Sequence, residues 1–177
     1  GNDPQWRARR NSYLNETESE TSANNSEARW IENDELKYSL RSVELFAPWI
    51  NRIYIVTDNQ SPKWLNRDNP KIHIIDHKEI LPADALPTFS ATAIESCISN
   101  IPGLSEYFIL GNDDLMLTAP VTQTDFFTEN GLPIVRLRKA AFNKRKAHKK
   151  GNYHIILDRM QNLVAEKYGK NIFHAPH

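Results

Sequence analysis

The chain has only one cysteine and no long apolar run, and each of these features excludes a class of protein. Because Cys97 has no partner cysteine, an internal disulfide framework is excluded and a reducing compartment is permitted. No apolar run approaches the roughly 20 residues that span a bilayer, and no signal peptide is recognisable. We therefore expect no transmembrane segment and a cytoplasmic location, with the inner face of the membrane as an open alternative.

The net charge is zero, but the charged residues are unevenly distributed along the chain. Of 177 residues, 25% are charged and 40% are hydrophobic, which is the balance of an ordinary soluble globular protein. Residues 136–150 nevertheless hold eight Lys or Arg and no acid. This basic segment favours an anionic ligand or surface, and a solvated loop explains it equally well. Because no nucleic-acid-binding motif accompanies the segment, we expect no nucleic-acid partner.

The length and the lack of internal repeats predict one domain over residues 1–177. Residues of about 11–27 are rich in Asn, Ser, Thr and Glu, so we expect a mobile low-complexity loop there. Cys97 is interpreted as a small core residue rather than a nucleophile. Four histidines have no motif around them and are expected mostly on the surface or in loops: His73, His77, His148 and His154.

Helical and strand patterns alternate along the chain, which predicts an α/β fold with a largely parallel sheet and flanking helices. Runs rich in β-branched residues indicate strands, and apolar residues at helical spacing between capping residues indicate helices. Strands are expected at 52–57, 71–75, 106–110 and 132–137. Helices are expected at 33–46 with Asn33 as the cap, after the cap Ser90 with Ile94 and Ile98 buried, and at 154–168 closed by Gly169.

The most informative motif runs from Glu106 to Leu115, where an apolar segment stops at Gly111 and two carboxylates, Asp113 and Asp114, follow. Open α/β sheets present ligands at the carboxyl ends of their strands. Carboxylates at such a place suit Mg²⁺, which often shares its coordination shell with substrate phosphates. The motif therefore favours phosphate-ester or nucleotide-sugar chemistry. A plain turn or a helix cap explains adjacent aspartates as well.

Several unusual short motifs in the stretch 33–126 resemble, in the same order, those of the second conserved block of the Stealth family. This family comprises bacterial capsular polysaccharide phosphotransferases and the catalytic subunit of the animal N-acetylglucosamine-1-phosphotransferase. The motifs include Leu86-Pro87-Thr88-Phe89-Ser90, Ile101-Pro102-Gly103-Leu104-Ser105 and Asn112-Asp113-Asp114. Gly1-Asn2-Asp3-Pro4-Gln5-Trp6 is similar to the end of the first block, and Phe173-His174-Ala175-Pro176-His177 to a histidine motif of the third.

The resemblance implies a Rossmann-like, nucleotide-sugar-transferase-like fold, truncated at both ends in this chain. It also implies transfer of a sugar-1-phosphate from a nucleotide diphosphate sugar to a sugar hydroxyl, in capsular or exopolysaccharide synthesis. The donor would be similar to a UDP-N-acetylhexosamine, the acceptor a polysaccharide or glycan, and the cofactor Mg²⁺ or Mn²⁺. The resemblance leaves open whether the chain by itself is active.

The same resemblance implies roles for individual residues. Asp113 and Asp114 would hold the metal, and His174 or His177 would accept the proton of the acceptor hydroxyl. Substrate contacts are expected from Asp3, Asn33, Arg41, Ser90, Glu95 and Asn112, and from Arg145 and Lys146 of the basic segment. Purely structural alternatives stay open: a turn for Asp3, a helix cap for Ser90, a solvated carboxylate for Glu95, a surface ion pair for Arg41 and a frayed terminus for the two histidines.

Two other functions remain possible from the residues alone. An ordinary glycosyltransferase would use the same acidic pair but break a different bond of the donor. A non-catalytic carbohydrate-binding or scaffolding fragment would bind without turnover. The nucleotide released by the reaction distinguishes the first alternative, and metal-dependent binding of a nucleotide sugar distinguishes the second.

Overall fold

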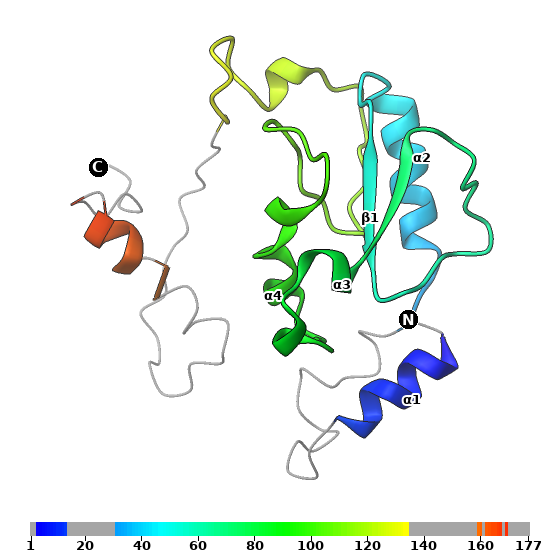
Figure 1. Cartoon of the computed structure of the whole chain (residues 1–177). Helices are drawn as coiled ribbons and strands as arrows, with labels where there is room; N and C mark the ends of the chain where they lie inside the picture. Colours follow the sequence, from blue (N-terminus) through cyan, green and yellow to red (C-terminus); the bar gives the residue numbers. More distant parts are fainter. Residues whose placement is uncertain (1–2, 14–30, 135–158, 161, 168, 170–177) are drawn as a thin grey trace, which may run out of the picture. The chain divides into compact units, whose positions relative to one another are not determined.

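The computed structural model describes residues 3–13, 31–134, 159–160, 162–167 and 169 (Figure 1). These residues fall into two units, Gly1–Leu132 and Pro133–His177, and each is described by itself. The low-complexity loop and the basic segment lie largely or wholly outside the described residues. The predicted site residues outside them are Arg145, Lys146, His174 and His177.

Two parallel strands form the sheet of the first unit (Figure 1). Strand β1 (Ile53–Thr57) pairs with β2 (Ile72–Asp76) in a register that runs from Ile53 opposite Ile72 to Thr57 opposite Asp76. β1 is rich in β-branched residues, and β2 has isoleucine at three of its five positions, a composition that favours strands. The predictions at 52–57 and 71–75 are thus confirmed, and the described residues fit the α/β class.

Four α-helices accompany these strands in the described part of the first unit. They are α1 (Pro4–Ser12), α2 (Glu35–Phe46), α3 (His77–Ile80) and α4 (Ala91–Glu95). The cap predicted at Asn33 is wrong by one residue, because Asp34 occupies the N-cap position of α2, with φ 64° and no side-chain capping bond. The cap at Ser90 is confirmed, since its hydroxyl accepts a hydrogen bond from the Ala93 N–H at 3.4 Å.

The hydrophobic core lies where β2, α3 and the turns after α4 meet. It consists of Ile75, Ile80, Leu81 and Ile101. Ile94, Cys97 and Ile98 pack against it while partly buried, which agrees with their predicted core positions. The core is thin: among the described residues, no large side chain is less than 2% exposed.

The strand predicted at 106–110 is wrong. These residues are assigned to no strand, and the side chains of 107–110 are 43–53% exposed. A strand exists only through hydrogen bonds to a neighbouring strand, and no described segment pairs with this one. The Tyr107 ring instead packs edge-on against Phe127. A Cβ at the neighbouring Gly131 would collide with the Tyr107 ring, and the φ of +76° at Gly131 is a second reason for glycine there.

The second unit is described only in part. Residues 159, 160 and 162–167 are helical. Gly169 follows at φ +66° and donates its N–H to the Ala165 carbonyl at 2.8 Å, which is the helix closure predicted for this glycine. Leu132 and Ile134 are in no strand, Pro133 forms an isolated β-bridge, and the rest of the strand predicted at 132–137 lies outside the described residues. Within the described ranges, no helix is both long and apolar enough to cross a membrane.

Candidate functional site

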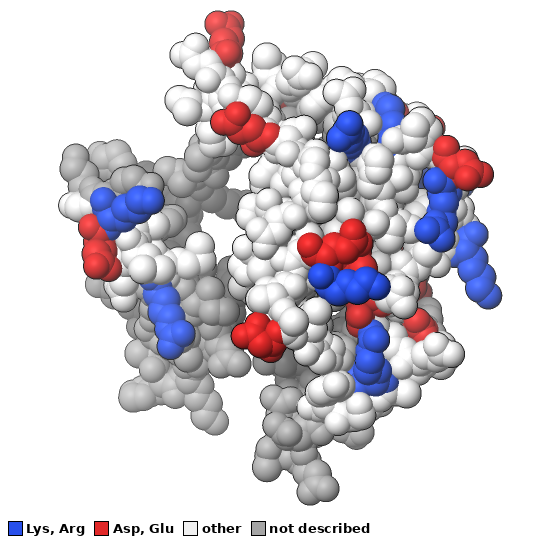
Figure 2. Space-filling view, viewed as in Figure 1, with Lys and Arg blue, Asp and Glu red and all other residues white. Residues whose placement is uncertain are grey.

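A wide cleft of about 3160 Å³ opens in the first unit. Its walls are β1, α2, the loop after β1 and the segment 107–117. Six of the residues predicted to act on substrate or metal line it: Asp3, Asn33, Glu95, Asn112, Asp113 and Asp114. Figure 2 shows that acidic and basic side chains alternate over a mainly uncharged surface on the face seen there. Neither sign forms a large field on that face.

The aspartate pair occupies a tight turn. The Leu115 N–H donates to the Asn112 carbonyl at 3.2 Å, so Asp113 and Asp114 are the two central residues of the turn. Both are exposed, and neither carboxylate has a hydrogen-bond or ion-pair partner among the described residues. The prediction that these adjacent aspartates form a turn is therefore correct for the backbone. A turn that presents two unpaired carboxylates to a cleft is also what a metal site shared with substrate needs.

Helix α2 fixes the chain directly after this turn. The Ser39 hydroxyl donates to the Leu115 carbonyl at 2.7 Å. The Ser42 hydroxyl donates to the Ser39 carbonyl at 2.7 Å and accepts the Leu117 N–H at 2.9 Å. Two serines one turn apart on the helix thus hold the segment that carries the carboxylates. Neither serine can be predicted as a site residue from the sequence, because serines inside a helix give no functional signal.

The carboxylates fit a magnesium or manganese site that is completed by water and substrate. No group of three or more His, Cys, Asp or Glu side chains that would hold a metal occurs in the described part of the chain. A closed site made of protein ligands is therefore absent from that part. Mg²⁺ characteristically takes one or two carboxylates and completes its shell with water and substrate phosphates. Asp113 and Asp114 match this requirement in chemistry and exposure.

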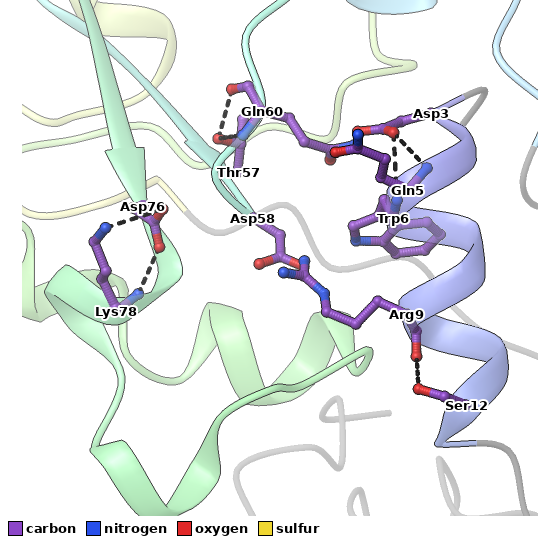
Figure 3. Close-up of polar contacts among 10 residues, drawn as sticks. All are labelled: Asp3, Gln5, Trp6, Arg9, Ser12, Thr57, Asp58, Gln60, Asp76 and Lys78. Atoms are coloured by element: carbon purple, nitrogen blue, oxygen red, sulfur yellow. Dashed lines mark hydrogen bonds and ion pairs between the residues drawn. The ribbon is translucent and has the colours of Figure 1, made fainter.

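The amino end of α1 is fixed to the loop after β1 (Figure 3). The Asp3 carboxylate accepts hydrogen bonds from the backbone N–H groups of Gln5 and Trp6 at 2.9 and 3.3 Å, and from Gln60 Nε2 at 2.9 Å. The bond from Gln60, followed by that from the Trp6 backbone, lowers the pKa of the Asp3 carboxyl. Asp3 is therefore an ionised helix cap that also lines the cleft.

A second contact joins the same elements further along. Arg9 of α1 forms an ion pair with Asp58, the residue directly after β1 (Figure 3). Together with the bond between Asp3 and Gln60, this pair fixes α1 at the carboxyl end of β1. Helix α1 is not among the helices predicted from the sequence, although Asp3 before Pro4 is a strong start signal, with aspartate as the cap and proline as the first helical residue.

His77 is a functional candidate that sequence reasoning placed wrongly on the surface. It follows β2 directly, begins α3 and is only 8% exposed. Burial lowers the pKa of its imidazole; the nearby Asp58 and Asp76 carboxylates oppose this effect, and Arg9 adds to it. The chain lies here at the carboxyl ends of both strands, so the rule that ligands bind at such ends was the available signal. A small pocket of about 340 Å³ opens beside it.

The other predicted residues have local roles in the described structure. Asn33 donates its backbone N–H and its Nδ2 to the Glu35 carboxylate at 2.6 and 2.9 Å, and these bonds lower the pKa of Glu35. Arg41 lies over the Tyr38 ring, 5.8 Å from its centre, and does not line the cleft. Ser90 caps α4 outside the cleft, whereas Glu95 is exposed on the cleft wall.

Fold and site together define an α/β protein with parallel strands and an exposed carboxylate pair on the wall of a wide cleft. The family model described as "Stealth protein CR2, conserved region 2" matches residues 29–135, which is more than half of the chain. The chain therefore belongs to the Stealth family. This result confirms the resemblance found in the stretch 33–126.

Curated relatives from several bacteria agree with this assignment. Capsular polysaccharide phosphotransferase WcwK of Streptococcus pneumoniae is 49% identical over 133 residues, which are 75% of this chain and 40% of the relative. Exopolysaccharide phosphotransferase cps2G of Lactiplantibacillus plantarum is 47% identical over 75% of this chain and 38% of its own length. Capsular polysaccharide phosphotransferase LcbA of Neisseria meningitidis is 40% identical over 176 residues, 97% of this chain and 48% of the relative. The chain thus spans less than half the length of these relatives.

Proposed function

We propose that the full-length protein transfers a sugar-1-phosphate from a nucleotide diphosphate sugar to a hydroxyl of a growing capsular polysaccharide or exopolysaccharide. The names of the relatives, all polysaccharide phosphotransferases, support phosphotransfer in polysaccharide synthesis. The observation that carries the finer proposal is the exposed turn of Asp113 and Asp114, whose carboxylates lack partners among the described residues. Transfer of a phosphoryl group between two oxygens requires positioning and charge neutralisation, for which such a turn is suited.

In this proposal Asp113 and Asp114 hold Mg²⁺ or Mn²⁺, which neutralises charge on the donor pyrophosphate when it is bound. Asn112 positions the turn or contacts a phosphate oxygen. Asn33 and Glu95, on other walls of the same cleft, offer hydrogen bonds to sugar hydroxyls. Asp3 is ionised and has its acceptor positions partly used by Gln60 and α1, so its contribution to substrate is orientation of the cleft wall.

The proton of the acceptor hydroxyl has to leave as the new P–O bond forms. We assign its acceptance to His174 or His177, because imidazole titrates near neutral pH. Arg145 and Lys146 are assigned to the donor phosphates. The attacking oxygen of the acceptor bonds to the phosphorus nearer the donor sugar, and the bond from that phosphorus to the bridging oxygen breaks. A nucleoside monophosphate leaves.

We further propose that the complete fold is Rossmann-like and that the protein acts in the bacterial cytoplasm, with the inner face of the membrane as the place where its acceptor grows. The two parallel strands and the cleft beside their edge support this fold. A nucleotide sugar similar to a UDP-N-acetylhexosamine is the proposed donor.

Analysis of the released nucleotide tests this function. Full-length protein is incubated with a nucleotide diphosphate sugar, an oligosaccharide acceptor and Mg²⁺, and the products are separated by anion-exchange chromatography and identified by ³¹P NMR. We expect a nucleoside monophosphate and a phosphodiester in the acceptor product. A nucleoside diphosphate together with a plain glycosidic product would establish an ordinary glycosyltransferase instead.

A further inference from the structure

The side of α1 that faces the loop after β1 carries an aromatic ring between two polar pairs. Asp3, Trp6 and Arg9 follow one another at intervals of three residues, so they are neighbours on one side of the helix. Asp3 is bonded to Gln60, and Arg9 is paired with Asp58. In Figure 3 the Trp6 ring projects from α1 between these two pairs. Trp6, Gln60 and Asp58 all line the wide cleft.

The Trp6 indole is held in place by a second ring. It meets the Phe89 ring edge to face, with ring centres 5.6 Å apart and an angle of 75° between the planes. Trp6 is nevertheless only partly buried, and Phe89 lines the cleft with it. The indole is therefore an apolar plane whose orientation is set in advance and which stays accessible from the cleft.

The polar groups beside this ring have acceptor atoms to spare. Gln60 donates its Nε2 to Asp3 at 2.9 Å, and Asp58 uses its Oδ2 to pair with Arg9. No described residue donates to Gln60 Oε1 or to Asp58 Oδ1. Because the bonds already made hold both side chains, these two oxygens are preorganised hydrogen-bond acceptors.

This combination suits a sugar ring better than a phosphate. One face of a pyranose carries C–H groups that pack on an aromatic plane, and its hydroxyls donate to amide and carboxylate oxygens. Ligand sites of this kind combine aromatic walls with a few placed polar groups. A phosphate would be repelled by the carboxylates of Asp3 and Asp58, and the guanidinium of Arg9 is already paired. The chemistry therefore favours an uncharged saccharide.

We propose that Trp6, Gln60 and Asp58 form a subsite for an uncharged pyranose ring. The indole covers the apolar face of the sugar, and Gln60 Oε1 and Asp58 Oδ1 accept hydrogen bonds from its hydroxyls. Two sugars of the proposed reaction have this chemistry, the terminal ring of the acceptor and the sugar of the donor. The subsite rests on the proposed function only for the identity of its occupant, because binding of a free sugar requires neither metal nor turnover.

Saturation-transfer difference NMR with simple glycosides tests the subsite in full-length protein. The probes are the methyl pyranosides of glucose, galactose, mannose, N-acetylglucosamine and N-acetylgalactosamine, titrated in EDTA while aromatic protein protons are irradiated. We expect at least one glycoside to bind, with the strongest transfer to C–H protons on one face of its ring. Trp6→Ala should weaken this binding at least about fivefold and Gln60→Ala about threefold or more, because each removes a contact with the sugar.

Tyr13→Ala is the matched control. Tyr13 follows the last residue of α1 and also packs against Phe89, with ring centres 6.1 Å apart, but it does not line the cleft. Its loss should leave glycoside binding unchanged, and Trp6→Phe, which keeps an aromatic plane, should retain most of the binding. Circular dichroism checks that each variant is folded. Gln60→Ala leaves the ring contacts of α1 in place and decides the question if Trp6→Ala does not fold.

A competition experiment distinguishes the two possible occupants. The glycoside is bound first, and the nucleotide diphosphate sugar that binds most tightly in Mg²⁺ is then added to saturation. Displacement of the glycoside assigns the subsite to the sugar of the donor, and simultaneous binding assigns it to the acceptor, so either result supports the subsite. If no nucleotide sugar binds, the proposed reaction is contradicted while the glycoside result stands.

Three results would overturn the proposal. Wild-type protein that binds none of the glycosides has no such subsite. Unchanged binding in Trp6→Ala or in Gln60→Ala would place the sugar elsewhere in the protein. An equal loss of binding in Tyr13→Ala and Trp6→Ala would show that the packing of α1, rather than contact with the indole, is responsible.

Discussion

Asp113 and Asp114 are adjacent carboxylates that have no partners among the described residues and line the cleft, whereas Glu95 and Glu129, which share both properties, have no acidic neighbour in the sequence. The carboxylates of Asp3, Asp58 and Asp76, by contrast, are bonded to α1 or to neighbouring backbone. Carboxylates with partners stabilise the fold, whereas carboxylates without them are available for a cation. The account of function at the scale of single residues depends on this difference.

Replacing either carboxylate by its amide removes the charge and keeps the shape. We predict that Asp113→Asn or Asp114→Asn in the full-length protein lowers the transfer rate at least about 1,000-fold, because a lost metal ligand removes several kcal/mol of transition-state stabilisation. The rate is measured by release of nucleoside monophosphate, with circular dichroism as the check on folding. Asp68→Asn, an exposed aspartate outside the cleft, is the matched control and should retain full rate. Near-normal turnover in both amide variants would refute the metal assignment.

His77 gives the protein a pH dependence with a definite sign. Burial lowers the pKa of the folded imidazole below the ordinary value of 6.5, so below pH of about 6.5 the unfolded chain binds a proton that the folded chain does not. Stability from this residue is complete above that pH and decreases as the pH falls toward the folded pKa. We predict that the thermal midpoint falls between pH 7.5 and 5.5, and that His77→Phe reduces this fall.

The matched control for His77 is Ile80→Val, a change in the same short helix that introduces no titratable group. It should lower stability by about 0.5–1.5 kcal/mol at every pH. An unchanged slope of midpoint against pH in the His77 variant would show that the pH dependence arises elsewhere.

A motif and a family resemblance predicted Asp113, Asp114, Asn112 and Glu95 as site residues. All four line one cleft in the described structure, and their role in function stays a prediction. Sequence reasoning misplaced His77, since burial of a polar residue after a strand depends on what packs over it. The roles of Ser39 and Ser42 could not be predicted for a similar reason: their hydroxyls bond to residues more than seventy positions away. Such contacts leave no local pattern in the sequence.

At the scale of elements, α2 is the support of the site. Ser42 is 9% exposed and accepts the Leu117 N–H, so Ser42→Ala leaves that N–H without its acceptor. We predict a loss of about 1–3 kcal/mol in the free energy of unfolding and a several-fold lower transfer rate in protein that is still folded, because the aspartate turn loses its anchor. Urea unfolding and turnover are measured on the same samples.

Ser96→Ala is the matched control for this prediction. The Ser96 hydroxyl donates to the Ala93 carbonyl at 2.7 Å and contacts Cys97 Sγ at 3.8 Å, both within its own segment. Its removal should change stability by less than about 0.5 kcal/mol and leave turnover unaltered. Equal effects of the two substitutions on turnover would argue against a role of α2 in holding the turn.

The elements predicted correctly are those whose signals are local. The strands β1 and β2 have β-branched runs, and the Ser90 cap bonds an N–H three residues away. The segment 106–110 has an equally strong strand pattern, yet it is not a strand, because pairing requires a neighbour and the described residues offer none. Intrinsic propensity determines which secondary structure a segment favours, and tertiary contacts decide whether that structure forms.

At the scale of the whole molecule, the described structure is a partial sheet with a thin core and a wide cleft. The α/β class and the parallel pairing follow from the sequence. The Rossmann-like arrangement stays a prediction, since two strands are too few to define a strand order. This chain covers 38–48% of the length of the three relatives compared above.

The central claim is that Asp113 and Asp114 hold a divalent cation that bonds to the pyrophosphate of a sugar donor. Calorimetric titration of the full-length protein with a panel of nucleotide diphosphate sugars tests it, with Mg²⁺ or EDTA in the buffer. The account predicts binding of at least one donor in Mg²⁺, loss of that binding in EDTA, and at least tenfold weaker binding in the Asp113→Asn, Asp114→Asn double variant. Binding that is equally tight without metal, or unchanged in the double variant, would contradict the claim.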